Sequence, residues 1–172
     1  MKKLLIGILI LLVLGLTFYF ISDLGGTDKV KLTISEEKMI SLKGVHYRGT
    51  PQDPLLKTSF DRVQEALEKS QGGHLHTIYY VEPAGKLDTM EVFVGIEKAL
   101  MVGEGWDEKE ISCEGSVVAE VSGNRWLMPG PNKVKKLIRE YAEDNKLKLQ
   151  DVFIDQITSP DQVRVIAPIK AQ

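Results

Sequence analysis

Two stretches of alternating hydrophobic and polar residues predict the central hairpin of the fold, and they cover residues 77–83 and 90–97. Both are rich in β-branched and aromatic residues, and Pro83-Ala84-Gly85 ends the first one. Because side chains alternate along a strand, the second stretch divides into two faces. One face carries Met90, Val92, Val94 and Ile96, and the other carries Glu91, Phe93, Gly95 and Glu97. The first face predicts packing against a helix, whereas the second combines an aromatic ring with two acids.

The pattern around this hairpin occurs twice along the chain. In the first copy, an extended stretch at about 38–48 precedes a helix that begins at Asp53-Pro54, an N-cap residue followed by proline. The second copy repeats this order with an extended stretch at about 116–121, an apolar helical stripe at 134–141 and two strands at 152–158 and 162–169.

The spacing of the prolines supports a duplication. Pro54 and Pro131 are 77 residues apart, and so are Pro83 and Pro160. We therefore predict an α+β fold in which two strand-helix-strand-strand modules form one antiparallel sheet with two helices packed on one face. The join between the two modules predicts a groove, and such grooves are common ligand sites.

The N-terminus has a different pattern. Residues 4–21 carry no charge and follow Lys2 and Lys3. A helix of this length spans about 27 Å, close to the ~30 Å hydrocarbon thickness of a bilayer. A cleaved secretory signal and an uncleaved anchor both fit, but the length of the run and the absence of a small-residue cleavage site favour the anchor.

The two lysines predict a cytoplasmic N-terminus, which places the remaining domain on the outer side of a membrane. The predicted organisation is a single transmembrane anchor at 1–22, a linker at 23–30 and one domain at 31–172, with repeat one at about 31–98 and repeat two at about 111–170.

Composition excludes several classes of function. A net charge of −2 over 172 residues provides no electrostatic footprint for nucleic acid. Cys113 is the single cysteine, so the chain has no intramolecular disulfide and no cysteine-based metal cluster. His74 and His76 share one face of a strand, but a surface position explains them better than a metal site. We predict neither a metal nor a cofactor.

The face opposite the helices supplies most of the candidate ligand-binding residues. Tyr80, Phe93 and Glu97 fall on it, although cross-strand packing of the two rings and a solvated glutamate are the plainer alternatives. A glutamate held between aromatic rings is expected to have a raised pKa. The predicted ligand-binding residues are Tyr47, Tyr80, Glu91, Phe93, Glu97, Trp126 and Arg164.

Three further features have two interpretations each. Trp126 either lines the groove or packs beneath the second helix. Trp106, in the loop that links the two copies, either caps the groove or packs locally. The second helix carries Lys133, Lys135, Lys136 and Arg139, which form a solvated face or touch acidic lipid headgroups.

The stretch Ile78-Tyr79-Tyr80-Val81-Glu82-Pro83, the duplication and the ending Asp161–Ile169 resemble the gyrase-inhibitor-like family. This family includes the effector-binding domains of some bacterial transcription activators, and the chain resembles a membrane-anchored member. The resemblance implies a central pocket for amphipathic or cationic small molecules. Arg164 stands where many relatives have an acid on the final strand, and a guanidinium favours carboxylate or phosphate.

The leading hypothesis is a membrane-tethered, non-catalytic domain that binds a small amphipathic molecule in the groove between the repeats. The alternative is a protein-interaction module of the cell envelope that uses the groove or an edge strand to hold a protein partner. An enzyme comes third, with Glu97 near Trp126 as its only candidate pairing. The sequence contains no Ser-His-Asp order, no P-loop and no dinucleotide-binding fingerprint.

Overall fold

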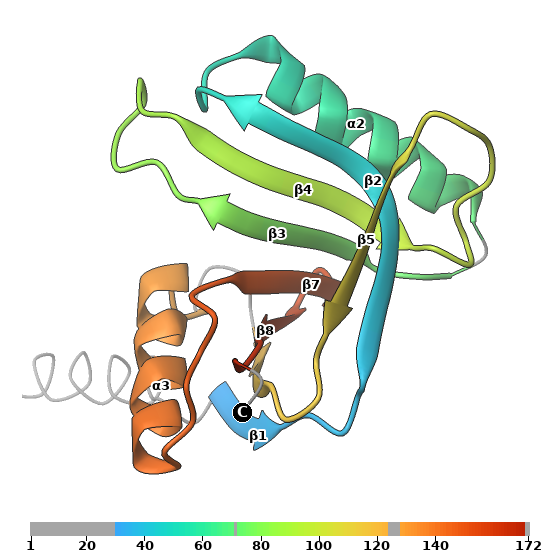
Figure 1. Ribbon diagram of the computed structural model, residues 1–172. Coiled ribbons are helices and arrows are strands. Elements are labelled where there is room, and N and C mark those ends of the chain that lie inside the picture. The colour runs from blue at the N-terminus through green and yellow to red at the C-terminus, as the bar shows by residue number, and fades with distance from the viewer. Residues whose placement is uncertain (1–29, 71, 124–127, 171–172) are drawn as a thin grey trace, which may run out of the picture.

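A computed structural model of the chain describes residues 30–70, 72–123 and 128–170. These residues form one eight-stranded antiparallel sheet and two helices, which confirms the predicted α+β class (Figure 1). The elements are β1 Val30–Ile34, β2 Met39–Gly49, α2 Pro54–Lys69, β3 Leu75–Val81, β4 Met90–Glu97, β5 Asp107–Ser112, β6 Val117–Ser122, α3 Pro131–Asp144, β7 Phe153–Ser159 and β8 Gln162–Ala167. Their order across the sheet is β1-β6-β8-β7-β3-β4-β2-β5.

Both helices begin where the prolines predicted. Pro54 and Pro131 are the first residues of α2 and α3, and proline suits this position because its missing N–H has no partner there anyway. The side chain of Asp53 caps α2 by accepting a hydrogen bond of 2.9 Å from the backbone N–H of Leu55.

The predicted duplication describes the sheet well. The modules β2-α2-β3-β4 and β6-α3-β7-β8 meet through the antiparallel pair β3–β7, which runs from Leu75↔Ile157 to Tyr79↔Phe153. Residues that face each helix on either side of this pair share one face of the sheet, so α2 and α3 cover the same face. We call this the helix face and the opposite one the far face.

Two strands were not predicted, and they cross between the modules. β1 precedes the first module but pairs with β6 of the second, whereas β5 precedes the second module but pairs with β2 of the first. The sequence of β5, Asp-Glu-Lys-Glu-Ile-Ser, contains a single large apolar residue, so its pattern does not indicate a strand. Charged, short strands are typical of sheet edges, where they discourage pairing with other chains.

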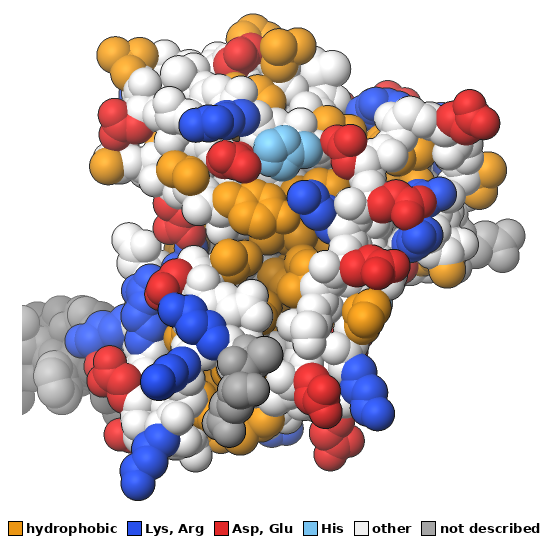
Figure 2. Space-filling model, viewed as in Figure 1, with side chains coloured by type: hydrophobic (Ala, Val, Ile, Leu, Met, Phe, Trp, Pro, Cys, Tyr) orange, Lys and Arg blue, Asp and Glu red, His pale blue; other side chains and the backbone are white. Residues whose placement is uncertain are grey.

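The sheet is strongly curved, and β2 and β5 run along one side of the molecule toward the other module (Figure 1). As a result, the far face has a core of its own, to which neither α2 nor α3 contributes a residue. Its buried residues come from six strands and the segment after β5: Ile40, Leu42, Ile78, Phe93, Cys113, Val118, Ile154 and Ile166. The surface is hollowed between the two modules, and hydrophobic side chains line the hollow (Figure 2).

None of the helices in the described part of the chain is long and apolar enough to cross a bilayer. The predicted anchor at 1–22, the linker before Val30 and Trp126 lie outside the described residues. Val30, the last residue of the predicted linker, is the first residue of β1.

Candidate functional site

A cavity of about 280 Å³ lies on the helix face where the two modules join. Its floor is made by Thr77 and Tyr79 of β3 and by Asp155 and Ile157 of β7. Side chains from both helices, from the segment before α3 and from the second module's strands form its walls, namely Phe60, Val121, Met128, Pro129, Pro131, Val134, Lys135, Val163 and Val165. We call it the seam cavity. Because both repeats contribute to it, this cavity has the position that the duplication predicted for a groove.

The polar groups on the floor of the seam cavity are set in mainly apolar surroundings. Burial raises the pKa of the Asp155 carboxyl, and the nearby Lys135 opposes this only in part. Burial, and then the neighbouring Asp155, raise the pKa of the Tyr79 phenol to about 12. The floor therefore presents an acid that is poorly solvated by water beside a phenol that remains protonated and available as a hydrogen-bond donor.

Lys135 contradicts the prediction of a continuous solvated basic face on α3. Lys133, Lys136 and Arg139 are exposed, and basic side chains gather over this helix in Figure 2. Lys135 is only 6% exposed because it belongs, with Val134 and Ile138, to the stripe of the helix that faces the sheet.

The ammonium group of Lys135 lies between aromatic rings and acids. It forms an ion pair with Glu82. It lies 5.2 Å from the centre of the Tyr79 ring and 5.1 Å from that of Phe153, within the range of cation–π attraction. Burial lowers the pKa of this lysine, and Asp155 opposes the effect.

Most of the predicted site residues lie on the other side of the sheet. The side chains of Tyr80, Glu91, Phe93, Glu97 and Arg164 alternate with those that face the helices, so they belong to the far face and do not line the seam cavity. Their role in ligand binding stays a prediction.

Phe93 and Tyr47 are core residues. Phe93 is fully buried beside Ile78 and Ile154, which matches the plainer alternative of cross-strand packing. Tyr47 is on the helix face, in a cluster that includes Tyr79. Its hydroxyl donates a hydrogen bond of 2.8 Å to the carbonyl oxygen of Thr50. Neither ring lines the seam cavity.

Glu97 differs from the expectation of a raised pKa. Burial raises the pKa of its carboxyl and is the largest single effect, but hydrogen bonds from His74 and from the Glu97 backbone, together with the nearby His76, lower the pKa below its ordinary value. The carboxylate accepts from the His74 backbone N–H at 2.9 Å and lies 2.8 Å from His74 Nδ1. Glu97 is therefore a carboxylate held in its charged form by hydrogen bonds from His74, not an acid held among aromatic rings.

A buried hydrogen-bonded row crosses the far face. Arg164 Nη1 donates to Gln156 Oε1 at 2.8 Å, and Gln156 Nε2 lies 3.1 Å from His76 Nε2. His76 Nδ1 lies 3.0 Å from the carbonyl oxygen of His74. Burial lowers the pKa of His76, since the charged imidazolium is disfavoured away from water. Arg164 is thus engaged with the sheet and points away from the seam cavity.

The remaining candidates, Tyr80 and Glu91, belong to a cluster near the surface, where β2 ends and β4 begins. Glu91 Oε1 lies 3.0 Å from His46 Nε2, and Arg48 Nε lies 3.6 Å from Glu91 Oε2. The ring of Tyr80 is 37% exposed and meets the His46 ring edge-on, with centroids 6.1 Å apart. Within the described ranges, no group of three His, Cys, Asp or Glu side chains could hold a metal ion.

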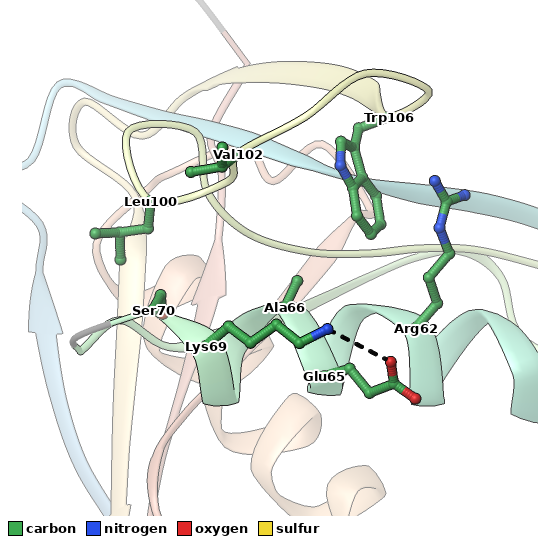
Figure 3. Close-up of a pocket in the computed structure, with 8 residues that line it drawn as sticks. All are labelled: Arg62, Glu65, Ala66, Lys69, Ser70, Leu100, Val102 and Trp106. Carbon is green, nitrogen blue, oxygen red and sulfur yellow. Dashed lines mark ion pairs between the residues drawn. The ribbon is translucent and has the colours of Figure 1, made fainter.

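A second cavity of about 330 Å³ lies between α2 and the loop before β5 (Figure 3). Arg62 stacks on the Trp106 ring at 4.0 Å and donates a hydrogen bond of 3.0 Å to the carbonyl oxygen of Gly105. Trp106 thus packs locally against α2, as one of the two interpretations of this residue held. Every side chain that lines this cavity comes from α2 or from the segment between α2 and β5.

Sequence comparison finds no relative: no protein-family model matches the chain. No curated protein sequence matches it either. Comparison of structures does find similar folds. The C-terminal domain of EcmrR has a TM-score of 0.55 at 11% identity, over 83% of this chain and 99% of that one. EcmrR in its DNA complex has a TM-score of 0.58 at 11% identity, over 99% of this chain and 69% of EcmrR.

A hydrolase from Listeria innocua has a TM-score of 0.56 at 7% identity, over 83% of this chain and 92% of that one. At such identities the likeness shows a shared fold alone. The fold that the resemblance to effector-binding domains implied is therefore confirmed, while membership of a membrane-anchored branch stays a prediction.

Proposed function

We propose that this protein binds a small amphipathic molecule with a cationic end in the seam cavity, without catalysis. The observation that carries the proposal is the carboxylate of Asp155 on the floor of a mainly apolar cavity to which both modules contribute. Such cavities, with few polar groups among many apolar ones, are typical of small-molecule sites. The volume of about 280 Å³ indicates a small ligand.

The chemistry of the cavity supports a cationic end. A carboxylate in apolar surroundings gains most from a positively charged partner, because burial makes its isolated charge costly. The rings of Tyr79 and Phe153 add cation–π attraction at the same place, where they already accommodate an ammonium group. Arg164 does not oppose a cation here, because it lies on the far face and is hydrogen-bonded to Gln156.

The apolar body of the ligand would rest against aliphatic side chains. Val134 of α3, Val163 and Val165 of β8 and Ile157 of β7 line the cavity next to the polar floor. Burial of apolar surface contributes about 25 cal/mol per Å², so even a ring-sized body adds to affinity substantially.

Binding measurements with benzyltrimethylammonium test this proposal. The matched probes are benzyl alcohol, which is neutral, and benzoate, which is anionic. At 100 times its dissociation constant a ligand adds about 2.7 kcal/mol of stability, which a thermal shift detects. We expect the cation to stabilise the protein most.

Two substitutions locate the site. Asp155→Asn removes the acid of the seam cavity, and Glu97→Gln removes one of the two candidate acids of the far face. We expect Asp155→Asn to weaken binding of the cation at least tenfold and Glu97→Gln to leave it unchanged. The reverse result would place the site on the far face, and no stabilisation by any probe would contradict the proposal.

The alternative of strand addition to a sheet edge finds little support. The edge strands β1 and β5 have five and six residues, and β5 carries four charged side chains. Short, charged edges discourage pairing with another chain. A protein partner held by backbone pairing is therefore not part of this proposal.

Tethering to a membrane through residues 4–21, with the domain on the outer side, is part of the proposal and depends on the sequence pattern alone. Fractionation of cells that express the full chain tests it. We expect the chain in the membrane fraction, resistant to carbonate extraction, and a variant that begins at Val30 in the soluble fraction. Recovery of the full chain in the soluble fraction would contradict the tether.

A further inference from the structure

We propose that Lys135 is the built-in occupant of the cation position in the seam cavity, and that a ligand cation enters by displacing its ammonium group. This inference depends on the proposed function, since it concerns the same cavity. In this role, Lys135 determines whether the cavity prefers a cationic or an anionic ligand.

The surroundings of the ammonium group are those of a bound organic cation. Two aromatic rings, Tyr79 and Phe153, lie 5.2 and 5.1 Å from it. The carboxylate of Glu82 forms an ion pair with it, and Asp155 acts on it electrostatically. Aromatic rings combined with carboxylates are the chemistry by which proteins hold alkylammonium groups. The side chain of Lys135 thus satisfies, from within the protein, the groups that a ligand cation would use.

The burial of Lys135 is costly unless these partners compensate it. Lysine is seldom buried, because its ammonium group loses hydration and its flexible stem loses rotamer freedom. The next lysine of α3 shows no such arrangement: Lys136 is exposed and pairs with Glu140 on the helix surface at 3.6 Å. The partners of Lys135 are thus groups around the cavity, whereas the partner of Lys136 lies on the surface of the helix.

The ammonium group of Lys135 also lies close enough to water to leave the cavity. The side chain of Glu82 is 46% exposed, so the ion pair lies at the boundary between the cavity and water. A lysine stem with four methylene groups can move its ammonium group to water when a ligand takes its place. Displacement then exchanges one cation for another next to Tyr79 and Asp155, and the charge of the cavity is unchanged.

Displacement predicts how the affinity for a ligand changes when Lys135 is removed. The ligand must compete with an internal cation, so the wild-type protein binds a cationic ligand more weakly than a cavity without Lys135 does. A carboxylate ligand has the opposite dependence, because Lys135 is the one positively charged side chain among the described residues that line the cavity.

Calorimetric titration of Lys135→Ala and Lys136→Ala with benzyltrimethylammonium, benzyl alcohol and benzoate tests this inference. Lys136→Ala removes the same charge from the same helix outside the cavity and is the matched control. We expect Lys135→Ala to bind the cation at least tenfold more tightly than wild type, benzyl alcohol within threefold of wild type, and benzoate more weakly. We expect Lys136→Ala to match wild type with all three probes.

Lys135→Met keeps the aliphatic stem and serves if the alanine variant folds poorly, with the same direction of change expected. Equal or weaker binding of the cation in Lys135→Ala and Lys135→Met would overturn the inference. If the cation still binds to wild type and Asp155→Asn abolishes this, the proposed function stands without the role of Lys135. If no probe binds to wild type or to either lysine variant, both proposals fail.

Discussion

Thr77 and Asp155 stand opposite each other in the β3–β7 pair, one from each module, and both contribute to the floor of the seam cavity. Their next neighbours along the strands face the other way: Ile78 and Ile154 are paired in the same register and belong to the far-face core. A single pair of strands therefore supplies both a candidate ligand site and a closed core. Because side chains alternate along a strand, every second residue faces the cavity and the residues between them face the far-face core.

Phe93→Ala tests whether the far face is closed. The ring of Phe93 is fully buried in that core, so we expect the substitution to lower the free energy of unfolding by about 3–5 kcal/mol. Denaturation by urea measures the loss. Tyr80→Ala is the control on the same face; its ring is 37% exposed, and we expect a loss of about 0.5 kcal/mol. Equal losses would show that Phe93 lies in an open groove.

Gly44→Ala tests the close approach of β2 and β4. A Cβ atom at Gly44 would overlap the carbonyl oxygen of Val94 and lie 2.5 Å from the Cα atom of Gly95, its cross-strand partner. Because backbone atoms cannot give way cheaply, we expect destabilisation of about 1–3 kcal/mol or more.

Gly85→Ala is the control for this substitution. A Cβ atom there meets the Asp88 carboxylate at 3.4 Å, an ordinary contact, so we expect little change in the unfolding free energy. A stable Gly44→Ala protein would contradict the pairing of these two strands.

Acidification should destabilise the protein through His76. Burial lowers the pKa of this histidine in the folded state below its ordinary value of 6.5. The unfolded state then binds a proton first as the pH falls, so stability decreases below about pH 6.5, by at most about 1.4 kcal/mol per pH unit.

Urea denaturation between pH 7.5 and 5.5 measures this decrease. We expect His76→Gln, which stays neutral beside Gln156, to have a flatter dependence than wild type. An unchanged slope in His76→Gln would contradict the burial of this imidazole.

Asp155 should act in the opposite direction. Its folded-state pKa is raised above the ordinary value of 3.8, so the folded state keeps the proton longer as the pH rises. Stability therefore falls as the pH rises from about 3.8 through the folded-state pKa, again by at most about 1.4 kcal/mol per pH unit.

Asp155→Asn removes this effect, because the amide does not ionise. We expect its stability relative to wild type to increase between pH 4 and pH 7, as measured by urea denaturation at each pH. Asp161→Asn, at an exposed position in the β7–β8 turn, should show no such trend. A constant difference for Asp155→Asn would mean that the carboxyl group is well solvated.

Local sequence signals were sufficient for most of the fold. The Asp53-Pro54 cap, the proline at 131 and the helical stripes placed α2 and α3, since caps and periodicity act within a few residues. Alternation placed β4 at its observed bounds, 90–97. The strands β1 and β5 were missed because each pairs with the module that it does not precede, and β5 has almost no apolar residue to mark it.

The sequence predicted a groove where the modules join, and the seam cavity lies there, but most of the residues named for ligand binding lie on the other face of the sheet, where their role stays a prediction. Tyr80 and Glu97 were predicted as site residues because their face of the hairpin combines polar and aromatic residues, whereas the opposite face of the second strand is apolar. Tyr79 and Asp155 carry equivalent signals, and Lys135 looked like part of a solvated helix face. A buried acid and a buried lysine are recognisable only after the partners that bury them are known.

The sequence alone determined the repeated order of strands and helix, the helix starts and the two-faced character of each strand, because those properties depend on neighbours along the chain. Only the tertiary structure decided which residues line the seam cavity and which are buried in the far-face core. The curvature of the sheet and the exchange of its edge strands bring together residues that are far apart in sequence, and burial, charge and pKa all depend on those distant partners.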